Sequence, residues 1–383
     1  MTQTTIVELG LFTGKPQHGN FGRFKDLLPV SRMAASTAPH QFTDSQTLAL
    51  PQTYSFAGEE KRTDTFLSET DTSCVLVLKH GMVVVELYRL SGGRQVQWIS
   101  WSVAKSFVSA LVGIAVDEGA IRSIDDAISD YIVVEPGSAY DGVSIRDVLQ
   151  MSSGARWNED YADATSDVHR LGATMAGAMS LDTFVATMVA ESKPGTVCRY
   201  NSGDTQALGA LLVHATGRSL TDYMREKLVE PLGFESDAYW LVDGTGMEMA
   251  FAGLNMTARD FAKLGELYRK KGQWNERQIV PEEWVTASVR ADAPHLQPGQ
   301  PILADHPLDL GYGYQWWLPN GDRGEFSAIG IYNQLVYVDP SRGVTIVKLS
   351  ANPRYGTSMD EATNREMENI AFLRAVSASF DSH

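Results

Sequence analysis

Apolar residues run together in two stretches that lie far apart in the chain. Residues 74–88 hold two β-branched runs around a turn at Gly81, and residues 335–349 hold two more around a loop at 339–343. Such runs around Gly- or Pro-containing turns predict β-hairpins. We therefore expect strands near both ends of the chain.

Between these stretches, apolar residues recur every three or four positions, as they do in amphipathic helices. Phe107 and Leu111 follow this spacing in a helix expected over residues 105–119. Thr257 is a predicted N-cap for a helix that runs toward Gly272. Further helices are expected over residues 144–150, 206–214, 220–227 and 358–378.

The order of strands, helices, strands and a final helix predicts an α+β fold within the broad α/β class. It consists of an antiparallel sheet flanked by helices, with an inserted all-helical domain. We expect a discontinuous sheet domain over residues 1–100 and 273–383, a mainly helical domain over 101–272, and an active site between them. Residues 1–55 are rich in Gly, Pro, Ser and Thr without a sustained period, so we expect them to be irregular.

The composition is that of an ordinary globular protein, with 43% hydrophobic and 21% charged residues in a chain of 383. Acidic residues outnumber basic ones by 47 to 32. The resulting net charge of −15 repels phosphate backbones, so we expect no nucleic-acid partner. No run of eighteen apolar residues occurs, so we expect no membrane span. The sequence predicts no particular oligomeric state.

The first ten residues lack a basic start followed by an apolar stretch, which favours the cytoplasm over secretion. Cys74 and Cys198 are the only cysteines, which excludes a disulfide framework and favours two reduced core thiols over one bridge. The eight histidines never stand three or four residues apart, and no Walker loop or zinc helix occurs. We therefore expect neither a metal nor an organic cofactor.

One short pattern able to carry chemistry is Ser102-Val-Ala-Lys105, at the start of the apolar helix. Three-residue spacing puts both side chains on one helix face, near hydrogen-bonding distance. Ser102 would lie in the first turn, where free amide N–H groups and the helix dipole favour negative charge. A serine becomes a nucleophile when a base takes its proton, and a buried, neutral lysine is such a base. The alternative is a polar helix start with a solvated lysine.

Two other segments offer partners for this pair. Tyr200-Asn201-Ser202 precedes a predicted helix, and a buried tyrosine beside a neutral lysine can share the serine proton and pass it to a leaving group. In Ser327–Ile331, a glycine at a strand edge, Gly330, lets a backbone amide approach a ligand closely. Acyl transfer uses two such donors on the oxyanion. Taken alone, each segment is equally compatible with a structural turn or a core strand.

Together these elements resemble the serine hydrolases of the class C β-lactamase and penicillin-binding-protein superfamily, over most of residues 75–350. The resemblance implies a β-lactamase/transpeptidase-like fold. Further segments that match it in order are Gly119–Asp126, Val143–Leu149, Ser153-Gly154, Leu208-Gly209, Thr216-Gly217 and Glu230–Gly233.

Within this superfamily the chain is most similar to the 6-aminohexanoate-dimer hydrolases, which are nylon-oligomer hydrolases, and to related carboxylesterases. The resemblance implies that Tyr161 hydrogen-bonds the leaving nitrogen of an amide and that Trp317 closes over the substrate. The motifs that carry it are Asn158–Tyr161, Thr257–Asp260, Gln315–Trp317 and Gly330-Ile331 followed by Gln334.

The same resemblance implies the catalytic roles. Ser102 would be the nucleophile, Lys105 its base and Tyr200 the proton shuttle. The backbone N–H groups of Ser102 and Ile331 would form the oxyanion hole.

The chain departs from the family pattern at two places. Where the β-lactamases have Lys-Thr-Gly on the last strand, this chain has Ala328-Ile329-Gly330, so the lysine that holds a substrate carboxylate is missing. The nylon-dimer enzymes hold the substrate's amino group with an acidic residue, and Gly172 occupies that position here. Asp163 and Asp167 lie nearby in the sequence.

We therefore expect a serine hydrolase that cleaves ester bonds of small molecules through an acyl-enzyme on Ser102, while Tyr161 leaves amide hydrolysis open. Three further functions remain possible for such a chain: an amide hydrolase acting on 6-aminohexanoate-type linear oligomers, a D-alanyl peptidase or β-lactamase, and a penicillin-recognition module that binds without catalysis.

Overall fold

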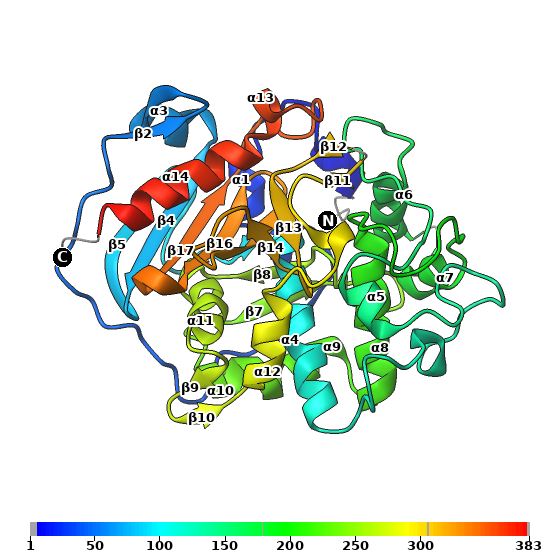
Figure 1. Cartoon of the computed structure of the whole chain (residues 1–383). Helices are drawn as coiled ribbons and strands as arrows, with labels where there is room; N and C mark the ends of the chain where they lie inside the picture. Colours follow the sequence, from blue (N-terminus) through cyan, green and yellow to red (C-terminus); the bar gives the residue numbers. More distant parts are fainter. Residues whose placement is uncertain (1–5, 178, 305, 381–383) are drawn as a thin grey trace.

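The computed structural model describes residues 6–177, 179–304 and 306–380, and a seven-stranded antiparallel sheet lies at its centre (Figure 1). The strand order is β13-β14-β15-β16-β17-β4-β5. Because β17 pairs with β4, the expectation of one sheet formed from both ends of the chain is confirmed, with β4–β5 and β16–β17 as the two hairpins. The strands are β4 (Thr72–Lys79), β5 (Met82–Tyr88), β13 (Leu310–Tyr312), β14 (Trp317–Pro319), β15 (Phe326–Gly330), β16 (Gln334–Asp339) and β17 (Val344–Ser350).

Side chains of this sheet alternate between two cores, as the two-residue period of a strand requires. Leu76, Leu78 and Val336 point into the larger core, where α11 (Ala258–Arg269) packs on β16 and β17. Val75 and Tyr337 point into the second core, which α14 (Glu366–Ala378) covers. The sheet is therefore buried on both faces, and α14 crosses one of them in Figure 1.

A second, four-stranded antiparallel sheet of order β1-β7-β8-β6 leads the chain into the helices. A short 3₁₀ turn, Trp101–Val103, follows it and is continued by α4 (Ala104–Asp117). The second sheet thus positions Ser102. Its strands are β1 (Val30–Met33), β6 (Trp98–Ile99), β7 (Ala238–Leu241) and β8 (Leu254–Met256).

Several of the remaining helices pack around α4 and α8 (Ser202–Thr216), which contact each other (Figure 1). The Asn201 side chain accepts hydrogen bonds from two backbone N–H groups of α8, and the predicted cap Thr257 accepts one from α11. The other helices are α1 (His18–Phe21), α2 (Phe24–Leu27), α3 (Thr63–Glu69), α5 (Ile145–Leu149), α6 (Asp167–Ala173), α7 (Leu181–Ala186), α9 (Leu220–Met224), α10 (Glu230–Leu232), α12 (Glu282–Ser288) and α13 (Glu361–Asn364).

The helical range 101–272 is interleaved with the sheets. α11 and the strands β7 and β8 fall inside this range, yet α11 packs on the central sheet and the two strands belong to the second sheet. Three short hairpins complete the fold: β2 (Thr53–Phe56) with β3 (Glu59–Arg62), β9 (Gln273–Trp274) with β10 (Arg277–Gln278), and β11 (Pro301–Leu303) with β12 (His306–Pro307).

The N-terminal segment differs from the irregular stretch expected over residues 1–55, of which 1–5 lie outside the described residues. It contains α1, α2, β1 and β2. Phe21 and Phe24 are fully buried, and both rings contact Trp101. The order of this segment comes from tertiary contacts with the site, which leave no periodic signal in the sequence.

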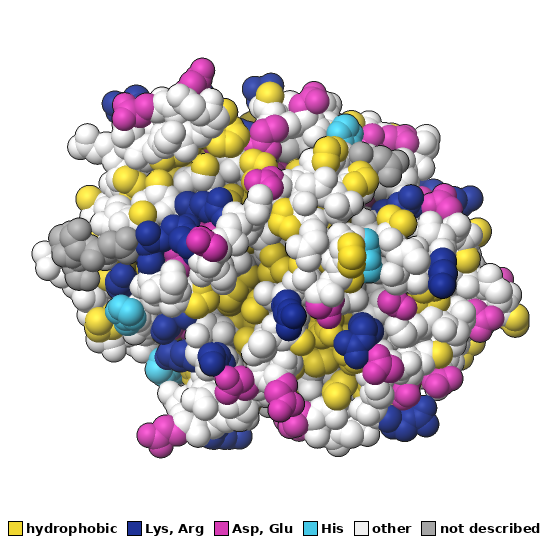
Figure 2. Space-filling view, in the orientation of Figure 1, with side chains coloured by type: hydrophobic (Ala, Val, Ile, Leu, Met, Phe, Trp, Pro, Cys, Tyr) yellow, Lys and Arg dark blue, Asp and Glu magenta, His cyan; other side chains and the backbone are white. Residues whose placement is uncertain are grey.

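Charged side chains of both signs cover the surface. On the face shown in Figure 2, Lys and Arg side chains are interspersed with Asp and Glu. Within the described residues, no helix is long and apolar enough to cross a membrane.

Candidate active site

Ser102 and Lys105 meet at the start of α4, as their spacing predicts. The Nζ atom of Lys105 lies 2.9 Å from Ser102 Oγ. Ser102 belongs to the 3₁₀ turn just before the α-helix, and the preceding Trp101 has a positive φ of 45°. A non-glycine residue in this conformation is uncommon and is held only by the surrounding structure, so the turn fixes the direction of the serine side chain.

The environment of Lys105 favours the neutral amine. Its side chain is buried, and its Nζ also contacts Ser202 Oγ at 3.1 Å and the Phe251 carbonyl oxygen at 3.0 Å. Burial lowers the pKa of Lys105 to about 7, against the opposing effect of the Glu159 carboxylate. An amine with such a pKa can accept a proton near neutral pH.

Tyr200 lies beside this pair, in the segment that leads into α8. Lys105 Nζ is 4.9 Å from the centroid of the Tyr200 ring. Burial raises the pKa of Tyr200 well above its ordinary value, while a hydrogen bond with Ser102 acts in the opposite direction. The structure thus brings the three predicted polar side chains into one cluster.

The end of β15 lies directly against the backbone of the serine. An ideal Cβ on Gly330 would be 2.7 Å from the Ser100 carbonyl oxygen and 3.0 Å from the Ser102 backbone nitrogen. Only a glycine allows this approach, which also brings Ile331 to the wall around Ser102. Tyr332, the next residue, has a positive φ of 61°.

The site has two compartments that share Ser102, Tyr161 and Ile331. The larger has a volume of about 180 Å³ and a mostly apolar lining. The smaller has a volume of about 20 Å³. Trp317 lines the smaller compartment, with its ring 5.0 Å from that of Tyr200, so both residues expected to contact substrate lie at the site.

Glu159 is a site residue with no role expected from the sequence, although it lies within the Asn158–Tyr161 motif. This buried carboxylate accepts hydrogen bonds from the Tyr161 hydroxyl at 2.8 Å, from Ser202 Oγ at 2.7 Å, from the Ser202 backbone N–H, and from Trp157. Its place in this motif, two residues before Tyr161, is the signal that could have found it.

The N-terminal segment supplies a second unexpected part of the site. Leu11 and Phe12 line the larger compartment, and the Phe12 ring stacks on Tyr161 at 5.1 Å. The Phe12 backbone N–H donates to the Tyr332 hydroxyl at 2.7 Å. No local pattern around these residues indicates this role.

The two departures from the family pattern fall in different parts of the site: the Ile329-Gly330 pair lines the smaller compartment, and Gly172 lies at the larger one. Gly172 lines it, and an ideal Cβ there would meet no atom within 4 Å. Asp163 and Asp167 are not among the residues that line either compartment. The Asp167 carboxylate instead pairs with Arg170 and accepts from a backbone N–H.

The thiols of Cys74 and Cys198 are free and buried, as expected from the sequence. Among the described residues, no group of three His, Cys, Asp or Glu side chains could hold a metal ion.

This fold, with a serine and a buried lysine at the start of a core helix, defines the class of protein. The sequence profile of the Beta-lactamase family matches residues 73–369, and the chain belongs to this family of serine hydrolases. It is 31% identical over 345 residues to the 6-aminohexanoate-dimer hydrolase of Paenarthrobacter ureafaciens, a match that covers 87% of this chain and 85% of that protein.

Two solved structures share the fold. A Bacillus anthracis protein with the provisional name 6-aminohexanoate-dimer hydrolase has a TM-score of 0.82 at 21% identity, and the match covers 99% of each chain. EstCE1, a hydrolase with promiscuous acyltransferase activity, has a TM-score of 0.64 at 17% identity, over 82% of this chain and 96% of that one. The resemblance inferred from the sequence is thus confirmed.

Proposed function

We propose that this protein cleaves ester bonds of small molecules through an acyl-enzyme on Ser102. The observation that carries the proposal is the 2.9 Å contact between Ser102 Oγ and Lys105 Nζ, with burial lowering the pKa of Lys105 to about 7. A neutral amine has two N–H groups and one lone pair. The N–H groups donate to Ser202 Oγ and the Phe251 carbonyl, and the lone pair accepts the Ser102 proton.

In the acylation step, Ser102 Oγ attacks the carbonyl carbon while its proton moves to Lys105. The backbone N–H groups of Ser102 and Ile331 hold the developing oxyanion, and each such donor contributes about 3–4 kcal/mol. Tyr200 passes the proton to the leaving alkoxide as the C–O bond breaks. In the second step, water gives a proton to Lys105 and attacks the acyl carbon. The bond between that carbon and Ser102 Oγ then breaks, and the lysine returns the proton to Oγ as the acid leaves.

Ester hydrolysis is favoured over amide hydrolysis because an alkoxide needs less protonation to leave than an amine does. The Tyr161 hydroxyl, which would assist an amine, already donates to Glu159 at 2.8 Å. The larger compartment, with Leu11, Phe12 and Phe251 in its wall, suits short alkyl or acyl groups, and Trp317 closes over the substrate on the other side.

The direct test is hydrolysis of p-nitrophenyl acetate and butyrate by wild type and Ser102→Ala. We expect at least a thousandfold loss of kcat/KM in the variant. Ser109→Ala is the matched control, because Ser109 is buried on the same helix and lines neither compartment, so its activity should stay within twofold. If Ser102→Ala kept more than a tenth of the wild-type rate, Ser102 would not be the nucleophile.

A second candidate function is hydrolysis of 6-aminohexanoate-type linear oligomers, which cleaves amide bonds. The 31% identity to the Paenarthrobacter enzyme favours it, and Tyr161 lines both compartments. Gly172, without a side chain to hold an amino group, argues against efficient cleavage. For this candidate, Tyr161→Phe should reduce amide hydrolysis at least tenfold more than ester hydrolysis; equal losses would exclude the leaving-group role.

D-Alanyl peptidase or β-lactamase activity and ligand binding without catalysis have less support. β15 carries Ala328 where a β-lactamase or D-alanyl peptidase has a lysine for the substrate carboxylate. A module that only binds ligands would not need a buried lysine in contact with a serine, and a fluorophosphonate should leave it unlabelled. A cytoplasmic location stays a prediction.

A further inference from the structure

One buried carboxyl group at the site has no part in this mechanism. Glu366, in the first turn of α14, is 6% exposed and lines the smaller compartment together with Ser102 and Tyr200. Its Oε1 accepts a hydrogen bond of 2.5 Å from the Tyr355 hydroxyl. Its Oε2 is also buried, but no group in the described part of the chain bonds to it.

A buried carboxyl oxygen without a hydrogen-bond partner lowers the stability of the protein. Burial without a hydrogen-bond partner costs about 1–3 kcal/mol, and more for a charged group. A hydrogen-bond donor that reaches Glu366 Oε2 through the compartment would remove this cost, and the described residues supply none.

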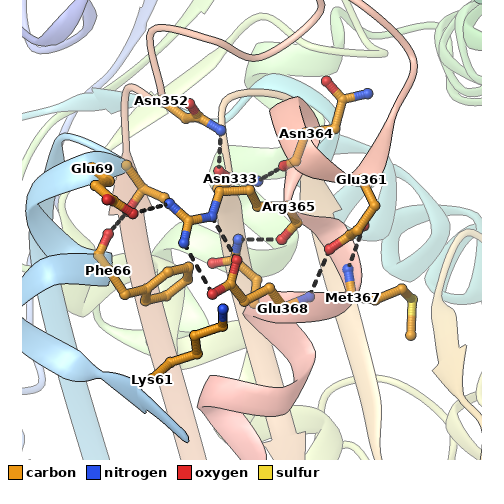
Figure 3. A network of polar contacts seen from close by, with 12 residues as sticks. Lys61, Phe66, Glu69, Asn333, Asn352, Glu361, Asn364, Arg365, Met367 and Glu368 are labelled. Atoms are coloured by element: carbon orange, nitrogen blue, oxygen red, sulfur yellow. Dashed lines mark hydrogen bonds and ion pairs between the residues drawn. The ribbon is translucent and has the colours of Figure 1, made fainter. Parts of the chain in front are cut away.

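The surrounding contacts hold Glu366 in place, as Figure 3 shows for its neighbours. Glu361 accepts hydrogen bonds from the backbone N–H groups of Met367 and Glu368, at the start of α14. Arg365 forms ion pairs with Glu69 and Glu368. The first turn of α14 is thus fixed from both sides of Glu366 in the sequence.

The same network ties the end of α13, two residues before Glu366, to the turn after Ile331. Asn333 Nδ2 donates to the Asn364 carbonyl at 2.7 Å, and Asn352 Nδ2 donates to Asn333 Oδ1 at 3.0 Å (Figure 3). Because Ile331 lies against Ser102, the network fixes the carboxyl relative to the nucleophile.

The charge around Glu366 favours a cation. Beyond Leu303 and Leu308, Glu366 also lines an outer cavity of about 230 Å³. The acidic residues of that cavity's wall include Asp309 and Glu361, and neither Lys nor Arg is among its described lining residues.

Lys348 is the basic side chain that acts on Glu366 from β17, but it does not satisfy the carboxyl. Its Nζ donates to Ser350 Oγ at 2.7 Å, and burial lowers the pKa of Lys348 well below its ordinary value. Lys348 therefore leaves Glu366 Oε2 available to a ligand.

The size of the smaller compartment limits which cationic groups can enter it. A volume of about 20 Å³ admits one water-sized group, which is the size of a primary ammonium group. A carboxylate, a guanidinium group or an aromatic ring is too large.

We propose that Glu366 binds a primary ammonium group carried by one arm of the substrate, beside the reacting carbonyl; the assignment of that ligand as a substrate rests on the proposed function. The site thus selects for aminoalkyl esters or amides. The anion-holding lysine of the β-lactamase pattern is absent from β15, whereas a carboxyl group from α14 lines the site.

The test uses butylammonium, 1-butanol and butyrate as inhibitors of p-nitrophenyl acetate hydrolysis, with enzyme-free rates subtracted. Burial raises the pKa of Glu366 to about 8, so at pH 8.5 most of the carboxyl groups are ionised while butylammonium stays charged. For wild type we expect a Ki at least tenfold lower for butylammonium than for butanol, with butyrate the weakest. Equal Ki values for butylammonium and butanol would mean that the compartment holds only water, and would overturn the proposal.

The variant Glu366→Gln keeps the shape and the Oε1 acceptor but removes the charge. Its Ki for butylammonium should rise at least tenfold, while its Ki for butanol changes less than twofold. Asp163→Asn is the matched control, since it removes a carboxylate that lines neither compartment, and it should behave as wild type. An unchanged butylammonium Ki in Glu366→Gln would contradict the assignment; if this variant did not fold, the wild-type comparison would still decide.

Binding without turnover separates this proposal from the proposed function. In Ser102→Ala, about 10 mM butylammonium should raise Tm more than the same concentration of butanol does. This concentration is of the order needed for a ligand with a millimolar Kd. Adding Glu366→Gln to this variant should abolish the difference. If wild type hydrolysed no ester but this shift were present, the proposed function would fail and the ammonium site would stand. If wild type hydrolysed esters but butylammonium and butanol had the same effect on Tm, the proposed function would stand and the ammonium site would fail.

Discussion

At the scale of single residues, the proposed chemistry depends on a lysine that burial keeps uncharged. Burial lowers the pKa of Lys105 to about 7, so the amine is protonated below that pH and cannot accept the Ser102 proton. We expect kcat/KM for a neutral ester to fall about tenfold per pH unit below 7 and to be level above it. A pH profile from 5.5 to 9 measures this, with Lys105→Arg inactive throughout. A profile flat down to pH 5.5 would exclude Lys105 as the base.

Glu159 raises the pKa of Lys105 without contacting Ser102. Its carboxylate acts on Lys105 and raises the pKa against the effect of burial, and it accepts from Ser202, which contacts the lysine. Glu159→Gln should therefore move the acid limb of the profile to lower pH, by about half a unit or more. Asp167→Asn, which changes a carboxylate outside both compartments, should leave the limb in place. An unmoved limb in Glu159→Gln would reduce Glu159 to a structural role.

At the scale of elements, the site depends on the end of β15 packing against the turn before α4. A methyl group on Gly330 would approach the Ser100 carbonyl oxygen to 2.7 Å, so Gly330→Ala must push the strand away from Ser102. Losing the alignment of one oxyanion donor costs about 10²–10³ in kcat, and we expect that loss in ester assays. Gly19→Ala, whose Cβ meets nothing within 4 Å, is the control. A kcat within threefold of wild type for Gly330→Ala would show that this approach is not needed.

The elements themselves were largely predictable, because their signals are local. Both hairpins follow from β-branched runs around Gly or Pro, and the predicted cap Thr257 accepts from Asp260 N–H. Ser102 and Lys105 could be paired because three residues of one helix separate them. A local pattern of this kind can be recognised in the sequence without knowledge of the tertiary structure.

The parts that could not be predicted depend on contacts between distant segments. Phe12 and Glu366 reach the site from opposite ends of the chain, and neither has a neighbouring motif. The helix α11 was expected from its spacing, but its packing on the central sheet follows only from the assembled core.

At the scale of the whole molecule, the N-terminal segment packs against the residues around the site and stabilises them. Phe21 is fully buried and its ring contacts Trp98, Trp101 and Tyr332. Phe21→Ala should lower the free energy of unfolding by about 3–5 kcal/mol, because it leaves a cavity in this aromatic cluster. Phe56→Ala, at a half-buried phenylalanine on β2, should cost clearly less. Urea unfolding measures both, and equal losses would mean that the segment only covers the surface.

Mass spectrometry of the protein after reaction with a fluorophosphonate, followed by peptide mapping, shows directly whether Ser102 is the nucleophile. We predict one phosphonyl group per chain, located on Ser102, and no adduct on Ser102→Ala. An adduct on another residue, or an unmodified Ser102 in a preparation that hydrolyses esters, would contradict the assignment of Ser102 as the nucleophile.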